Sequence, residues 1–265
     1  MPAVPALRYK RYCREIVGQT FELQQELDAV DLHQPVDGCP RWSLGDLLRH
    51  LGYGHRWATE IVREEAKKPP SDERLRQVQG DDDQDAADLG YWLAQGATGL
   101  TTALRAVGKD AKPWSPLPDG GARYWARRYA LETLIHRVDV AKTLGRRPDI
   151  DADLAADGVD EWLELVTAPT ADGANGRRGE LRKMVGKGRT IALVATDGPT
   201  WTLDLSHRRP TYRPVKTKKA GATIAAPAAE LLLVLHRRIP VQHKRVKVSG
   251  DKDLVRRFLK GSARS

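Results

Sequence analysis

The sequence predicts an α plus α+β protein, with an N-terminal four-helix bundle followed by a smaller α+β domain. Up to residue 168, apolar residues recur at helical spacing in long runs separated by loops that contain Pro and Gly. From residue 180 onward, short β-like runs alternate with turns. A length of 265 residues suits two domains, although one larger domain is also compatible with it. We therefore expect domains at residues 1–168 and 180–265.

The first helix is expected over residues 5–31, where an apolar stripe runs between charged neighbours. Gly18 weakens the helix propensity in its middle. The next segment, 31–41, contains two prolines and a glycine, so we expect it to be a loop. The apolar stripe consists of Ile16, Phe21, Leu23, Leu27 and Val30.

A second helix is expected from Ser43 to about residue 67. Asp46 follows Ser43 by three residues, which is the spacing of a capping box, and Trp42 can pack on the leucines behind the cap. His50 lies within the leucine stripe of this helix, and His55 is rotated from it by about 140° at 100° per residue. A straight helix therefore cannot bring both histidines to one site. A lone histidine in such a stripe is more often a core residue than a ligand.

Two more helices are expected at residues 86–107 and at about 122–144, each with apolar residues at helical spacing. The acidic cluster before the first of them is interpreted as a solvated loop and helix N-terminus rather than a Ca²⁺ site. Four amphipathic helices joined by such loops indicate a four-helix bundle, whose core is a recurrent place for metal sites. The cluster consists of Asp81, Asp82, Asp83 and Asp85.

After Gly145 the pattern changes from long helices to shorter elements. A fifth helix is expected over 150–166, followed by a linker at 169–179. Strands are predicted at 190–195, 200–205, 222–225 and 246–251, and helices at 227–235 and 254–259.

The net charge of +9 is unevenly distributed. Residues 1–150 hold 22 basic and 22 acidic side chains, whereas residues 151–265 hold 22 and 13. This asymmetry supports the division into two domains and leaves open an anionic partner for the C-terminal part.

Composition also favours a cytoplasmic protein without a membrane partner. No run of about 18 apolar residues indicates a transmembrane helix, and residues 1–10 lack the apolar segment of a secretory signal. The only cysteines, Cys13 and Cys39, are too few for a disulfide framework and are expected to be small buried apolar residues.

The run from Arg127 to Asp139 carries the clearest chemical signal. Glu132 and His136 lie four residues apart, so a helix would project both from one face toward a shared point. A carboxylate oxygen and an imidazole nitrogen are two of the ligands that a Zn²⁺-type ion needs. The alternative is a hydrogen-bonded Glu–His⁺ pair on a solvated surface, and a third ligand elsewhere would decide between the two.

Three segments together resemble the mycothiol-dependent maleylpyruvate isomerase family, whose N-terminal half is a DinB-like four-helix bundle with a divalent metal. Residues 39–51 resemble the loop and first metal-binding helix of the family. Residues 128–139 carry the spacing R-x-x-x-E-x-x-x-H-R-x-D of its second metal-binding helix, and residues 155–161 carry A-x-D-G-x-D-E. Weaker matches at 196–198, 226–233 and 248–251 follow in the expected order, so the resemblance spans nearly the whole chain.

The resemblance implies that His50, Glu132 and His136 are the metal ligands. Two neutral histidines and one carboxylate leave an open position, as in catalytic zinc sites, and a thiol entering it would become a thiolate. The resemblance also implies an arginine contact to an anionic substrate, at Arg238 or, in the alternative register, Arg237. The alternative is a solvated helix end favoured by the helix dipole. His236 stands where the family usually has a tryptophan, which leaves the substrate open.

The expected function is therefore an enzyme in which a metal, expected to be Zn²⁺, activates mycothiol or a similar small thiol for isomerisation or S-transfer on a small electrophilic substrate. Asp139 or Tyr129 could orient a ligand or help with proton transfer, or serve structure alone. A different class of function is a non-enzymatic protein whose basic C-terminal domain binds nucleic acid or another polyanion, although aromatic residues for base stacking are not interleaved with its charges. A metal-containing carrier or sensor is a third possibility.

Overall fold

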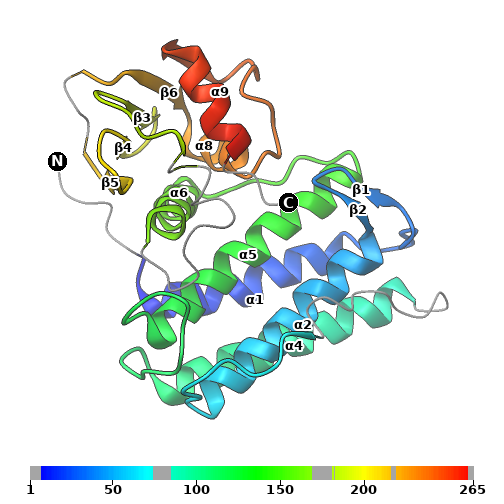
Figure 1. Cartoon of the computed structure of the whole chain (residues 1–265). Coiled ribbons are helices and arrows are strands. Elements are labelled where there is room, and N and C mark those ends of the chain that lie inside the picture. Colours follow the sequence, from blue (N-terminus) through cyan, green and yellow to red (C-terminus); the bar gives the residue numbers. More distant parts are fainter. Residues whose placement is uncertain (1–6, 74–84, 169–180, 182, 216–218, 262–265) are drawn as a thin grey trace. The chain divides into compact units, whose positions relative to one another are not determined.

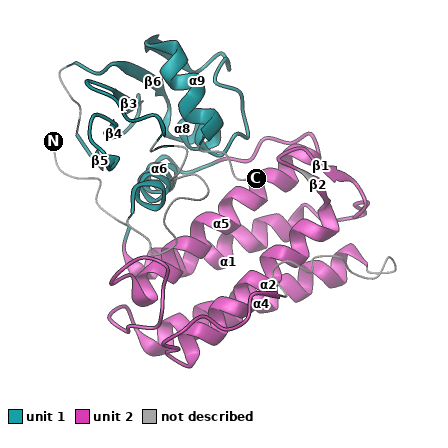
Figure 2. Cartoon of the chain, in the orientation of Figure 1, with its two compact units in different colours: residues 1–7, 150–265 teal, residues 8–149 magenta. Residues whose placement is uncertain are grey.

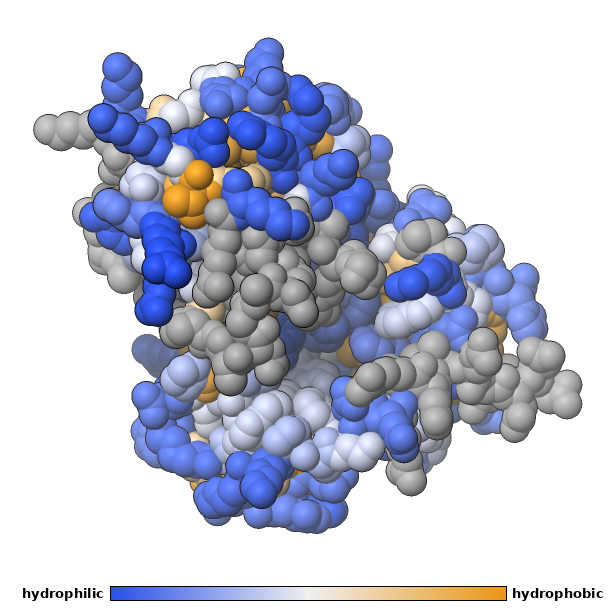
Figure 3. Space-filling model, viewed as in Figure 1, coloured by the Kyte–Doolittle hydropathy of each residue, from blue (hydrophilic) through white to orange (hydrophobic). Residues whose placement is uncertain are grey.

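The computed structural model describes residues 7–73, 85–168, 181, 183–215 and 219–261. The chain divides into two compact units, one of residues Arg8–Asp149 and one built on Ile150–Ser265 (Figure 2). Among the described residues no helix is long and apolar enough to cross a membrane. On the face drawn in Figure 3, strongly apolar residues are confined to small patches among the coloured atoms.

The first unit is a four-helix bundle, as the sequence predicts. Its long helices are α1 (Tyr9–Gln25), α2 (Leu44–Arg63), α4 (Ala86–Val107) and α5 (Gly121–Thr143) (Figure 1). Helices α1 and α2 each pack against both α4 and α5, so α1 and α2 occupy opposite corners of the bundle. Leucines from α1, α2 and α4 and a valine from α5 meet in one buried cluster.

Helix α1 is shorter than predicted, because it ends at Gln25. Ile16 and Leu23 are fully buried, and Leu27 is buried just beyond the end of the helix. The expected place of Phe21 in the buried stripe is wrong, since its side chain is 58% exposed. Phe21 lies five residues after Ile16, and five residues turn a helix to a different face.

The connection from α1 to α2 contains a short antiparallel hairpin of β1 (Pro35–Val36) and β2 (Cys39–Ser43), where a loop without strands was expected. The two residues between the strands are Asp37 and Gly38, a pair whose backbone preferences suit a tight hairpin turn. Pro35 lies in the edge strand, where a missing backbone N–H is tolerated. The two prolines of this segment, which led to the prediction of a loop, lie within the strands of the hairpin.

The predicted capping box is confirmed at the start of α2. The Ser43 hydroxyl accepts from the backbone N–H of Asp46 at 3.2 Å, and the Asp46 carboxylate accepts from the backbone N–H of Ser43 at 2.9 Å. Trp42, directly before the cap, packs against the cluster that contains Leu47 and Leu48. At the start of α4, Asp85 caps the helix by accepting from the N–H of Ala87 at 2.6 Å. The rest of the acidic cluster lies outside the described residues.

The second unit holds a mixed five-stranded sheet in the order β5-β4-β3-β6-β7. Strand β3 pairs antiparallel with β4 and parallel with β6, and β7 pairs antiparallel with β6. The predicted strands are found with boundaries shifted by at most one residue, but β5 was not predicted. The strands are β3 (Thr190–Ala195), β4 (Thr200–Asp204), β5 (Thr211–Arg213), β6 (Ala222–Ala226) and β7 (Lys247–Gly250).

The described part of this unit also contains α6 (Ala152–Thr167), α8 (Ala228–Leu235) and α9 (Lys252–Gly261). Helix α6, which the sequence prediction grouped with the bundle, packs against α8 and β5. Its Trp162 ring also lies 5.6 Å from the ring of Phe258 on α9. The predicted linker at 169–179 lies outside the described residues.

Asp160 ties α6 to the sheet. Its carboxylate accepts from the indole N–H of Trp201 on β4 at 3.0 Å and from the hydroxyl of Tyr212 on β5 at 3.3 Å. Trp201 is fully buried, so its N–H depends on a protein partner. Asp160, the second Asp of the A-x-D-G-x-D-E segment, therefore has a structural role in joining α6 to the sheet.

We predict that Asp160→Ala lowers the free energy of unfolding by about 1–3 kcal/mol, because the buried indole N–H of Trp201 loses its acceptor. Urea denaturation followed by tryptophan fluorescence measures the change. Asp153→Ala is the control, since Asp153 is exposed in the first turn of the same helix and should contribute less than about 1 kcal/mol. Equal effects of the two substitutions would contradict the prediction.

Candidate metal centre

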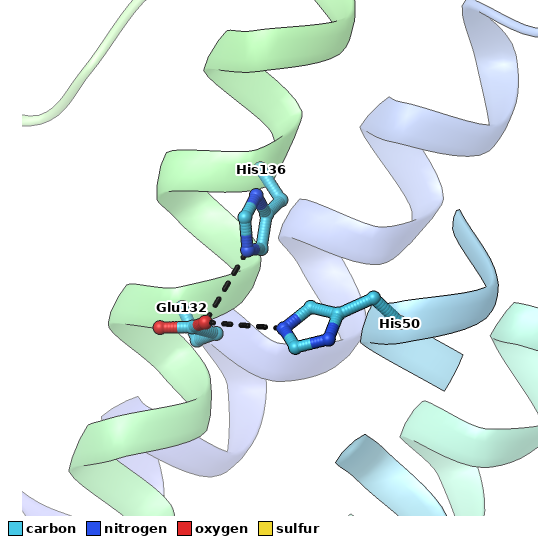
Figure 4. Close-up of side chains that lie close together, drawn as sticks. All are labelled: His50, Glu132 and His136. Atoms are coloured by element: carbon cyan, nitrogen blue, oxygen red, sulfur yellow. Dashed lines mark hydrogen bonds and ion pairs between the residues drawn. The ribbon is translucent and has the colours of Figure 1, made fainter. Parts of the chain in front are cut away.

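The candidate centre lies inside the helical unit, where α2 and α5 face each other. His50 comes from α2, and Glu132 and His136 come from successive turns of α5 (Figure 4). One oxygen of Glu132, Oε1, lies 3.2 Å from Nε2 of His136 and 3.8 Å from Nε2 of His50. One ligand-type atom of each residue lies within 4.8 Å of the other two. The structure thus brings together the three side chains that the family resemblance implies as ligands.

Asp139 orients the imidazole of His136. The Asp139 carboxylate lies 3.0 Å from Nδ1 of His136, and its side chain is fully buried. A proton on Nδ1 donates to this carboxylate, which directs Nε2 toward Glu132. Burial by itself lowers the pKa of His136, but the hydrogen bonds to Asp139 and Glu132 outweigh it, so the pKa is raised above its usual value.

Each of the other two side chains also has a neighbour that holds it. The guanidinium of Arg128, one helical turn before Glu132, forms an ion pair with Oε2 of Glu132. The indole of Trp42 lies against His50, with 4.6 Å between ring centroids, and 6.5 Å from the ring of His136. Asp139, Arg128 and Trp42 thus each contact one of the three polar groups.

This donor set fits a divalent metal ion of the Zn²⁺ type. Two imidazole nitrogens and a carboxylate oxygen face one small volume, and the carboxylate hydrogen bond to Nδ1 of His136 is the support that metal-bound histidines usually receive. Nε2 of His136 and Oε1 of Glu132 lie within hydrogen-bonding distance of each other, at 3.2 Å. A cation binding between them would displace the proton that such a hydrogen bond shares.

His55, the second histidine of α2, has a different environment. It is fully buried, and its Nε2 lies 3.1 Å from the hydroxyl of Thr133, which donates in turn to the carbonyl of Tyr129. The Tyr129 ring lies 5.6 Å from the His55 ring. Burial first, and the nearby Arg56 charge second, lower the pKa of His55 to about 3. His55 is therefore a neutral core residue, and it does not share a site with His50, as the helical rotation predicts.

Arg128 and Trp42 are the neighbours that the sequence did not single out for a role at the centre. Arg128 precedes Glu132 by four residues, and this spacing is equally typical of an ion pair on a helix surface. Arg128 is also the first residue of the R-x-x-x-E spacing that resembles the family. Trp42 was expected to pack on the leucines behind the cap, and its ring also reaches His50. Its place directly before the helix that carries His50 was the available signal.

Arg237 and Arg238 lie in the second unit, at the end of α8. There they line an open cavity of about 460 Å³ together with the exposed side chains of Arg256 and Lys260 from α9. The guanidinium of Arg238 donates to the carbonyl of His236 at 2.8 Å. Arg237 adopts a left-handed backbone (φ 61°) at the helix end, where glycine is the usual residue. The predicted role of Arg238 in catalysis stays a prediction.

The fold and this site define a class of two-domain proteins that join a metal-capable helical bundle to a mixed α+β domain. Residues 13–141 match the mycothiol maleylpyruvate isomerase N-terminal domain, and residues 153–257 match the MDMPI C-terminal domain of the same family. The chain therefore belongs to the mycothiol-dependent maleylpyruvate isomerase family. No curated protein matches it by sequence.

Solved structures of similar fold agree with this assignment. The crystal structure of a mycothiol-dependent maleylpyruvate isomerase aligns with a TM-score of 0.61 at 15% identity, covering 94% of this chain and 96% of that one. A histidine-to-alanine variant described under the same name aligns with the same TM-score at 14% identity and with the same coverage. At such identities the likeness concerns the fold.

We predict that His55 makes the protein less stable in acid. Its folded-state pKa of about 3 lies below the value of about 6.5 in the unfolded chain, so its contribution is complete above pH 6.5 and declines as the pH falls toward 3. At pH 5 the loss from this group is about 2 kcal/mol. His55→Gln retains a donor for Thr133 but does not titrate, so its unfolding free energy should fall by about 2 kcal/mol less between pH 7 and pH 5.

Urea titrations at the two pH values measure this difference. His33→Gln is the control, because it makes the same substitution at an exposed position of the same unit. The same pH dependence in His55→Gln and the unsubstituted protein would refute the prediction.

Proposed function

We propose that the protein is a metal-dependent enzyme that uses mycothiol, or a similar small thiol, to isomerise or S-transfer a small electrophilic and anionic substrate. The observation that carries this proposal is the convergence of His50, Glu132 and His136 in a chain that belongs to the isomerase family. The proposal also places the enzyme in the cytoplasm, where its two free cysteines stay reduced.

The residues around the centre have separable roles in this proposal. A bound Zn²⁺ would supply the positive charge that favours the thiolate form of an incoming thiol. Asp139 holds a proton at Nδ1 of His136 and so leaves the lone pair of Nε2 available to bind a metal ion. Glu132 presents Oε1 to both histidines. The Trp42 ring packs against the imidazole of His50 and restricts its orientation.

The cavity at Arg238 supports the anionic character of the substrate. Four cationic side chains line it, and apolar side chains complete its wall, so it suits an organic acid better than an inorganic ion. The lining residues are Val234, Arg237, Arg238, Ile239, Pro240, Val241, Arg256, Leu259 and Lys260.

The second candidate is binding of nucleic acid or another polyanion through the basic C-terminal part, which carries 22 basic and 13 acidic residues. Neither matching family domain nor either of the two aligned structures is named as a nucleic-acid-binding protein. A DNA affinity that falls steeply with salt would favour this candidate over the enzyme.

We predict that His50→Ala abolishes both the metal content and the thiol-dependent turnover, because one of three protein donors is lost. Elemental analysis of the purified protein measures the first, and conversion of maleylpyruvate in the presence of mycothiol measures the second. His33→Ala, which changes an exposed histidine of the same unit, should alter neither. Full retention of zinc in His50→Ala would exclude His50 as a ligand.

We predict that Arg238→Gln raises the KM for an anionic substrate about 10-fold or more while the metal content stays unchanged. A lost charge-assisted hydrogen bond of about 1.5–3 kcal/mol gives this range. The matched control is Arg257→Gln, because Arg257 is exposed on α9, donates to a carbonyl of its own helix and does not line the cavity. Equal KM values for the two variants would remove Arg238 from the substrate site.

A further inference from the structure

We propose that Arg128 is a positioning residue that restricts Glu132 to one ligand oxygen and so keeps the metal centre at three protein donor atoms. The proposal rests on the metal site of the proposed function and adds the coordination mode of its carboxylate. The three ligand residues by themselves do not determine whether Glu132 binds the metal through one oxygen or both. We assign this choice to Arg128.

The two carboxylate oxygens of Glu132 face different groups. Oε1 faces both imidazoles, at 3.2 Å from His136 and 3.8 Å from His50. Oε2 accepts a hydrogen bond from Nη2 of Arg128. A carboxylate can bind a metal ion through one oxygen or through both. With Oε2 engaged by a guanidinium, the ion is offered Oε1.

The environment makes this ion pair persistent. The side chains of Arg128 and Glu132 are only 10% and 13% exposed, so water competes weakly for the guanidinium and screens the attraction less than at the surface. Both residues lie on α5, one turn apart, and the helix fixes the distance between their backbones. Glu132 would therefore need to break a largely dry ion pair before turning both oxygens to the metal.

Stability alone is a weak explanation for this pair. Removing two charges from water offsets most of their mutual attraction, and buried ion pairs are often replaceable by apolar side chains without loss of stability. The cation also lies next to a proposed metal ligand, where its charge opposes the charge of the ion. An arginine in this place is therefore better explained by the orientation that it imposes on Glu132.

The consequence for the reaction is a centre with room for exogenous ligands. Three protein donors around a Zn²⁺-type ion leave a position for the thiol, whereas a fourth protein oxygen would compete for it. Arg128 thus acts on the open position only through Glu132.

Cobalt substitution tests the proposal through a spectroscopic signature. Four-coordinate Co²⁺ absorbs visible light much more strongly than five- or six-coordinate Co²⁺. We expect strong absorption for the Co²⁺-loaded protein and weaker absorption for Arg128→Met, in which Oε2 is released to the metal. Cobalt affinity should be retained or increased in this variant, because a cation beside the ligand is removed. A merely structural role of Arg128 predicts the reverse pattern, with reduced affinity.

Two further variants serve as conservative rescue and matched control. Arg128→Lys retains a charged donor for Oε2 and should keep the spectrum of the unsubstituted protein. Arg123→Met removes an exposed arginine of the same helix, whose partner is Asp110 at 3.3 Å, and should change neither spectrum nor affinity. An unchanged spectrum in Arg128→Met would overturn the proposal.

X-ray absorption at the zinc edge of the unsubstituted protein gives a test that requires no variant to fold. The expected result is one oxygen from Glu132 and two imidazole nitrogens as the protein ligands. A bidentate carboxylate in zinc-loaded protein would overturn the role of Arg128 while leaving the proposed function intact. Failure of the protein to bind any divalent metal would instead overturn the proposed function, and the inference with it.

Discussion

The polar side chains buried along α5 are the constraint around which the helical unit is built. A buried polar group without a partner destabilises a fold by about 1–3 kcal/mol, so the neighbouring helices and loops must supply partners. Helices α1 and α2 supply some of these partners, and α5 itself supplies others. The pairs include Glu22 with Arg137 at 2.6 Å, His55 with Thr133 at 3.1 Å, Asp139 with His136 at 3.0 Å, and Arg128 with Glu132.

The start of α2 determines which of its residues reaches this polar line. The capping box of Ser43 and Asp46 sets the first turn, and the buried leucines behind it set the rotation of the helix about its axis. Together they place His50 beside Glu132 and turn His55 into the core against Thr133. The rotation of a single helix thus places one histidine at the candidate metal centre and the other, five residues later, in the core.

The helices and longer strands were predictable because their signals are local. Residues 86–107 and 190–195 show the helical and strand patterns within their own sequence, and both segments have the predicted boundaries. The three residues of β5 form a strand only because β4 lies beside them. The burial of Arg128 likewise depends on which helices pack nearby, and spacing along one helix cannot reveal that.

The motifs that extend the family resemblance into the second unit have structural explanations. Asp197 accepts from the N–H of Ala228 at 2.8 Å at the start of α8, and Asp251 accepts from the N–H of Leu254 at 2.9 Å at the start of α9. Gly250 has a left-handed backbone (φ 78°), and a side chain there would collide with the carbonyl of Gly221. These residues preserve the sheet and its helices whatever reaction the protein performs. The burial of charge around Glu132 has no comparable structural explanation, and a metal-dependent reaction at this centre accounts for it.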